Sequence, residues 1–318
     1  MTPADLSLTV LHAVRRAVDD GALRVDVPSR AKVERARPGG AGEYASNIAL
    51  ALARPAGRSA LDVAGILEER LRGVPGLRAV EITGPGFLNF TLRSDADADL
   101  VREILAAGTS YGHGAALAGT VVRLAGSDEP RAVVVVETLG RLLRSQGADV
   151  EVGADGGERV HVHPGMCDPG GDAVRWAFLR AAPHDRPLDP APLLVPHERN
   201  PLFRVRYAYS RTRRLLVNAR QLGFSPEQGE CDDPVLPALL RDHPLALLSA
   251  ARHRAPDRVA RHLEAVADAL LAFQHTVLPL GDEKPSAAHR SRLALAEAAG
   301  TVLAGGLSVL GISAPDRI

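Results

Sequence analysis

The sequence predicts an α+β N-terminal domain over residues 1–110, a short α/β connector over residues 111–198 and an all-α helical bundle over residues 199–318. Three observations predict this fold. Amphipathic helical segments flank two adjoining strand-like segments in the first part, short apolar runs surround one helix in the middle, and the last part is helical throughout. With 318 residues, of which 46% are hydrophobic and 24% charged, each part is long enough to bury a core.

The N-terminal part begins with an amphipathic helix over residues 4–20, in which Leu6, Val10 and Val14 face inward. The turn sequence Gly-Pro-Gly at residues 84–86 separates two strand-like runs and predicts a hairpin. The other predicted elements are helices over residues 44–53, 60–71 and 95–108, and the hairpin strands cover residues 78–83 and 87–93.

The second hairpin strand alternates between its two faces. Leu88 and Leu92 are expected to enter the core, which places Phe87 and Asn89 on the opposite face. An aromatic ring beside an amide can stack on an unpaired base and form hydrogen bonds with it. Alternatively, Phe87 packs beneath the first helix or a neighbouring domain.

The connector has the pattern of a fragment of an α/β layer, too short for a complete nucleotide-binding domain. Its predicted elements are strands over residues 120–125, 149–152 and 159–162 and helices over residues 131–147 and 172–182.

One candidate metal site lies in the connector. His161 and His163 would lie on one side of a strand, close to Cys167, but a fourth ligand would require Cys231 or His184. The alternative is a pair of ordinary surface histidines, so we expect no metal and no cofactor.

The segment from residue 200 to residue 223 predicts a long helix with Leu202, Val205, Tyr209, Thr212, Leu216 and Ala219 on one face. Arginines follow in two rows, with Arg199, Arg206, Arg213 and Arg220 in one and Arg204 and Arg211 in the other. No acidic residue occurs in this helix to support them at i,i+4 spacing. Either the helix has a solvated face, or it presents a face for polyanion, since arginine suits forked phosphate contacts. Further helices are predicted over residues 234–241, 244–253, 256–278 and 286–310, as an antiparallel bundle.

Composition limits the class of protein. Two cysteines imply no disulfide framework, no secretory leader pattern opens the chain, and no uninterrupted apolar run approaches the length of about 18 residues needed for a membrane span. We therefore expect a cytoplasmic protein without a membrane partner.

Five motifs, taken together and in order, resemble arginyl-tRNA synthetase. They are GEYASN at residues 42–47, GPGFLNF at residues 84–90, DAVR at residues 172–175, NP through YAYSR at residues 200–211 and GISAPDRI at residues 311–318. The first two resemble the N-terminal domain of that family, which touches the tRNA elbow, and the last two bracket its anticodon-binding domain, called DALR. The resemblance implies that the connector is a remnant of a catalytic domain. Ile318 stands where the family ends in Met.

The resemblance also bears on catalysis. A class I synthetase needs an H-x-G-H element and a lysine loop to stabilise charge on ATP. Neither occurs here: Ser127 to Pro130 stands in place of the first, and no lysine lies between Lys32 and Lys284. We therefore expect no enzyme activity and no dependence on ATP.

The favoured function is tRNA binding, with arginine-accepting tRNA as a candidate. The expected contacts are Phe87, Asn89, Arg199, Arg204, Arg206, Tyr207, Arg211, Arg213, Arg214, Arg220 and Ile318. Two alternatives remain. One is a regulatory subunit whose basic helix binds an acidic protein partner, and the other is an enzyme that takes arginine from charged tRNA in a pocket lined by His161, His163 or Asp168.

Overall fold

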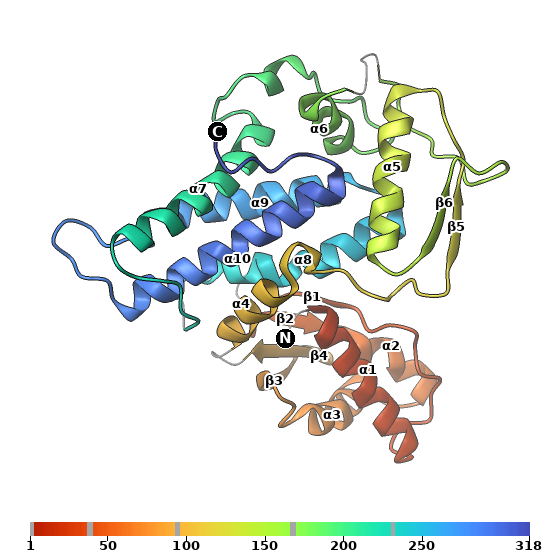
Figure 1. Ribbon diagram of the computed structural model, residues 1–318. Coiled ribbons are helices and arrows are strands. Elements are labelled where there is room, and N and C mark those ends of the chain that lie inside the picture. The colour runs from red at the N-terminus through yellow and green to blue at the C-terminus, as the bar shows by residue number, and fades with distance from the viewer. Residues whose placement is uncertain (1–2, 37–40, 93–95, 166–169, 230–232) are drawn as a thin grey trace. The chain divides into compact units, whose positions relative to one another are not determined.

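The computed structural model describes residues 3–36, 41–92, 96–165, 170–229 and 233–318 (Figure 1). The chain forms two compact units, residues 1–100 and residues 101–318, and helix α4 (Ala96–Ala107) spans the division between them. The three domain boundaries expected from the sequence stay a prediction.

The first unit combines three helices with an antiparallel sheet. The helices are α1 (Pro3–Asp19), α2 (Ile48–Ala56) and α3 (Ala60–Leu71). The strands are β1 (Val33–Arg35), β2 (Tyr44–Ser46), β3 (Leu77–Thr83) and β4 (Phe87–Leu92), in the order β1-β2-β4-β3. Strand β4 therefore has a neighbour on each side.

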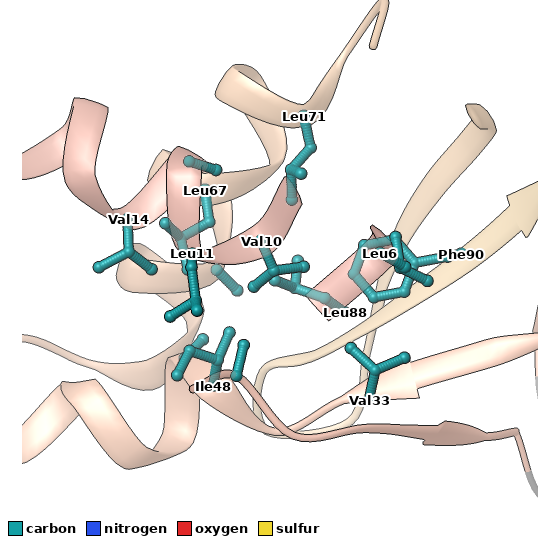
Figure 2. Packing of buried hydrophobic residues seen from close by; sticks show 14 of the residues in the cluster. Leu6, Val10, Leu11, Val14, Val33, Ile48, Leu67, Leu71, Leu88 and Phe90 are labelled. Atoms are coloured by element: carbon teal, nitrogen blue, oxygen red, sulfur yellow. The ribbon is translucent and has the colours of Figure 1, made fainter. Parts of the chain in front are cut away.

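The core of this unit lies between the helices and one face of the sheet. Leu6 and Val10 of α1, Leu67 of α3, and Leu88 and Phe90 of β4 are all buried in it, as Figure 2 shows. Burying a leucine or phenylalanine side chain contributes about 1.5–3 kcal/mol. The predicted hairpin, first helix and inward face of β4 are confirmed.

The predicted helix over residues 44–53 begins too early, because Tyr44–Ser46 is strand β2. The register pairs Tyr44 with Phe90 of β4 and with Arg35 of β1. Strand β1 lies in a polar segment for which no strand was predicted. Both strands depend on partners distant in the sequence, and local periodicity does not reveal such partners.

After the end of α4, the second unit continues with a short 3-10 helix, η1 (Gly108–Ser110), and a βαβ arrangement. Strand β5 (Val121–Leu124) pairs in parallel with β6 (Asp149–Val152), and helix α5 (Pro130–Ser145) connects them. Helix α6 (Asp172–Arg180) and the 3-10 turn η2 (Ala191–Leu194) follow. The predicted strand over residues 159–162 is absent; a single bridge joins Leu124 to Glu158.

A buried arginine holds this connector together. Arg131 in the first turn of α5 is 0% exposed, and its guanidinium donates to five backbone carbonyl oxygens. The acceptors are His163, Phe178, Ala181, Ala182 and Asp185, at 2.6–3.1 Å. Phe178 lies in the last turn of α6, where carbonyls lack partners within the helix, so Arg131 serves as a cap.

The rest of the unit is a helical bundle of α7 (Pro201–Gln221), α8 (Val235–His253), α9 (Asp257–Phe273) and α10 (Ala287–Leu310), with the 3-10 turn η3 (Gln274–Thr276) (Figure 1). Helix α10 contacts each of the other three. Helix α8 is continuous across Pro244, although two separate helices were predicted there. Proline removes one helix hydrogen bond without necessarily ending the helix when tertiary packing supports both sides.

Glycines let α10 approach its neighbours closely. A Cβ atom on Gly300 would lie 2.3 Å from Thr212 Oγ1 of α7, and one on Gly306 would lie 2.5 Å from Leu263 Cδ2 of α9. By length and composition α10 is long and apolar enough to cross a membrane, whereas no apolar run of that length was expected from the sequence. However, 78% of its apolar window is buried inside the protein, as expected for the central helix of a bundle.

Candidate nucleic-acid interface

Helix α7 is well specified at its start. The Asn200 side chain accepts a hydrogen bond from Phe203 N at 3.0 Å and donates to the carbonyl oxygens of Leu193 and Val195. Pro201 then occupies the first turn, where a missing N–H costs nothing. The buried face consists of Leu202, Val205, Ala208, Thr212, Leu215, Leu216 and Ala219. The arginines are therefore directed away from the bundle core.

Several arginines of α7 already have partners. Arg204 forms a forked pair with Asp268 of α9 at 2.9 and 3.3 Å. Arg206 contacts Asp172 of α6 and the carbonyl oxygen and hydroxyl of Ser313. Arg211 donates to Gln274 Oε1 at 2.6 Å. Although no acidic residue within α7 supports these arginines at i,i+4 spacing, other elements of the fold supply their partners.

The C-terminal segment, residues 313–318, lies along the arginine-bearing face of α7. Asp172 accepts hydrogen bonds from the backbone N and the hydroxyl of Ser313. Further along, Asp316 Oδ1 accepts from Tyr209 Oη at 2.8 Å and pairs with Arg213 Nε at 3.2 Å, and its carbonyl accepts from Ser210. The segment is thus held at two residues, at Ser313 by Asp172 and Arg206 and at Asp316 by side chains of α7.

The phenol of Tyr209 reflects this environment. Burial raises the pKa of Tyr209, and the hydrogen bond and negative charge of Asp316 raise it further, while Arg213 acts in the opposite direction. The phenol therefore stays protonated and able to donate across the range of pH in which proteins normally operate.

Together, α7 and the C-terminal segment enclose a groove of about 460 Å³, which we call the α7 groove. It is lined by Tyr207, Ser210, Arg211, Arg213, Arg214, Leu216, Val217, Arg220, Asp316, Arg317 and Ile318. Tyr207 is 40% exposed, and its ring stacks on that of Phe203 at a centroid distance of 5.6 Å. The groove thus combines several guanidinium groups with an exposed aromatic ring and exposed apolar side chains.

The groove contains most of the residues predicted on α7. Arg204 and Arg206 lie outside it, engaged with Asp268, Asp172 and Ser313, and Arg199 is exposed without a side-chain hydrogen bond among the described residues. Ser210, Asp316 and Arg317 were not predicted. Only the fold brings residue 316 beside residue 209, and no local pattern in the sequence could indicate it.

A second candidate site lies in the first unit, around the hairpin. Phe87 is 38% exposed, but Asn89 is buried, contrary to the expected polar face, because β4 is a central strand. The Asn89 amide donates to Thr83 Oγ1 at 2.7 Å. Both residues line a pocket of about 330 Å³, together with Lys32, Glu34, Arg35, Ala36, Ala45, Ser46, Asn47 and Thr83. We call it the hairpin pocket; its size suits one planar ring.

The connector has a hollow of about 550 Å³ at the carboxyl ends of β5 and β6, lined in part by Ser127, Asp155, Arg159 and His161. Nearby, the N–H groups at the N-terminus of α5 are already bound by a side chain of the protein, that of Glu129. Glu129 accepts hydrogen bonds from the backbone N–H groups of Arg131, Ala132 and Gly165 at 2.6–3.2 Å. A carboxylate therefore takes the place at this helix terminus that an anionic ligand would occupy.

The candidate metal ligands are not assembled in the part of the chain that the structure describes. His163 Nδ1 lies 3.3 Å from the carbonyl of Pro164, and the strand expected to align it with His161 does not form. Among the described residues, no group of three potential ligands is close enough to hold a metal ion. Cys167, Asp168 and Cys231 lie outside the described residues.

Comparison with known protein families defines the class of these two regions. Residues 8–92 match the profile described as "Arginyl tRNA synthetase N terminal domain", and residues 205–318 match "DALR anticodon binding domain". The chain therefore carries a synthetase N-terminal domain and an anticodon-binding-type domain. The resemblance to arginyl-tRNA synthetase that the motifs predicted is confirmed at the level of these two domains.

Individual relatives agree. The chain is 48% identical over 124 residues to an arginine–tRNA ligase of Frankia alni, covering 39% of this chain and 22% of the relative. It is 42% identical over 165 residues to an arginine–tRNA ligase of Micrococcus luteus, covering 47% of this chain and 30% of the relative. The chain thus spans less than a third of the length of these relatives.

Solved structures agree at the level of fold. An arginyl-tRNA synthetase from Thermus thermophilus superposes with a TM-score of 0.68 at 14% identity, covering all of both chains. The enzyme from Plasmodium falciparum gives 0.69 at 9% identity, covering 99% of each chain. The predicted fold class is confirmed.

The comparisons overturn one expectation, that this protein is not an enzyme. The relatives carry the name of an enzyme, arginine–tRNA ligase. The chain matches less than a third of their length. The absence of an H-x-G-H element and of a lysine loop from these residues therefore does not show that the protein lacks enzyme activity.

Proposed function

We propose that this chain binds tRNA, with the α7 groove as the principal contact. The observation that carries the proposal is the groove itself: Arg213, Arg214, Arg220 and Arg317 line one surface of a DALR domain beside an exposed tyrosine. Guanidinium groups suit forked contacts to phosphate, and an aromatic face suits stacking on an unpaired base. The names of the relatives, as ligases that act on tRNA, favour the same ligand.

In this proposal the two candidate sites contact different parts of the tRNA. The α7 groove meets the anticodon arm, where bases are unpaired. The hairpin pocket meets the elbow, where Phe87 stacks on a base and Asn89 accepts a hydrogen bond from its edge. Among the described residues nothing donates to Asn89 Oδ1, so this oxygen is available to a ligand. Arginine-accepting tRNA is the candidate because of the family resemblance.

The test is an electrophoretic shift with total tRNA at low salt, compared with an RNA duplex of similar length. We expect a clear preference for tRNA. Replacing Arg213 and Arg220 together by alanine is expected to weaken binding and to flatten the dependence of log K on log salt by about 0.7–0.9 for each phosphate that the protein no longer neutralises.

Replacing Arg123 and Arg186 together by alanine is the matched control, since both residues are exposed and neither lines the groove. Its binding curve is expected to match that of the wild type. Equal binding of duplex and tRNA by the wild-type chain, or an equal loss in the control, would contradict the proposal.

The hairpin pocket is tested separately with Phe87→Ala. We expect weaker binding with an unchanged salt slope, because stacking involves no phosphate. A changed slope with this variant would show that the pocket contacts the backbone instead.

A further inference from the structure

Asp316 is the acidic residue that lines the α7 groove among five arginines. Its side chain is 62% exposed, and that of its partner Arg213 is 51% exposed. Tyr209 and Arg213 hold its carboxylate, and Ser210 holds its backbone, so it has a defined position although it lies near the end of the chain.

The carboxylate of Asp316 interacts differently with a phosphate and with a base. A backbone phosphate that enters the groove meets a like charge and has to compete with Asp316 for Arg213. A base carries no net charge, and exocyclic amino groups on its edge can donate to a carboxylate. The same group that opposes phosphate is therefore a hydrogen-bond acceptor for a base.

The apolar part of the groove lining supports this distinction. Val217 and Ile318, which are 40% and 57% exposed, supply apolar surface, and Tyr207 supplies a ring face, on a groove that arginines also line. An unpaired base can place its face on such a surface and its edge toward Asp316. A duplex presents mainly its phosphates, because its bases are stacked and paired.

We propose that Asp316 is a specificity-determining residue, which makes the α7 groove select unpaired bases over the phosphate backbone of duplex RNA. This inference rests on the proposed function, since it assigns the selectivity of the same site. It requires Asp316 to lower the affinity for duplex RNA more than that for tRNA.

The experiment compares the wild type with Asp316→Asn and Asp282→Asn, using total tRNA and a blunt RNA duplex at two salt concentrations. Asp282 is exposed and does not line the groove, so its variant changes the net charge equally. For Asp316→Asn we expect duplex affinity to rise about two- to fivefold, the range of an exposed ion pair, with tRNA affinity unchanged or lower. For Asp282→Asn we expect no change in the ratio of the two affinities.

The double variant Asp316→Asn with Arg213→Gln identifies the cause, because the gain in duplex binding is expected to disappear when the released guanidinium is removed. A ratio that Asp316→Asn leaves unchanged, or a gain equal for both ligands, overturns the inference. Failure of the wild-type chain to bind tRNA is a separate result, which counts against the proposed function. Thermal unfolding of each variant confirms that the fold is intact.

Discussion

Arg131→Met is expected to destabilise the second unit strongly. The guanidinium of Arg131 donates to five carbonyl oxygens, and those of Phe178 and Ala181 are in fully buried hydrogen bonds. Methionine has a similar length and fills the same space but donates nothing. Each buried carbonyl left without a donor costs about 1–3 kcal/mol, and the other three can turn toward water.

The expected loss is therefore about 2–6 kcal/mol in the free energy of unfolding. With a urea m-value of about 2–3 kcal/mol/M for a unit of this size, the midpoint falls by about 1–3 M. The chain has one tryptophan, Trp176, which is fully buried in α6. Its fluorescence reports directly on the helix that Arg131 caps.

Two further variants sharpen the test. Arg131→Lys retains the charge and some of the donors, so it should recover part of the loss. Arg123→Met, at an exposed position on β5, should stay within about 0.5 kcal/mol of the wild type. A wild-type midpoint for Arg131→Met would refute the reasoning, and so would equal losses at residues 131 and 123.

Two other predictions concern packing and pH. Gly300→Ala should destabilise the bundle by about 1–3 kcal/mol, because the new Cβ would overlap Thr212 of α7. In the control Gly65→Ala, in α3, the new Cβ meets nothing within 4 Å, so this variant should be as stable as the wild type or more stable. Thermal unfolding of the two variants measures the difference. Burial, and then the charges of His262 and His113, hold the pKa of His243 well below 6.5. The His243 side chain therefore stays neutral in the folded state, whereas in the unfolded state it gains a proton as the pH falls below 6.5. Stability should therefore be fully present above pH 6.5 and should fall by about 1.4 kcal/mol per pH unit below it, with a smaller fall in His243→Leu; identical urea midpoints at pH 7.5 and pH 5.5 would contradict this.

The elements that the sequence predicts well are those whose signal is local. The apolar residues of α7, which recur at intervals of three and four residues, and the Gly-Pro-Gly turn of the hairpin each lie within one short window. The elements predicted wrongly depend on distant partners. Tyr44 becomes part of a strand because Phe90 pairs with it, and residues 159–162 fail to become one because only Glu158 reaches β5.

The same limit applies to the candidate site. The arginine rows were visible in the sequence because all their members lie on one helix. Their partners were not, since Asp172, Asp268 and Asp316 lie 34 to 107 residues away from the residues that they hold. Local charge patterning therefore predicted a face for polyanion but not which arginines remain available on it.

The close approach of α10 to α7 has a consequence for how the groove can respond to a ligand. At Gly300 the two helices meet with no side chain on one of them, so α7 cannot slide inward without steric overlap. The opposite wall, residues 313–318, is attached by a few polar contacts at the surface. When a ligand enters the α7 groove, we expect α7 to keep its position and residues 313–318 to move.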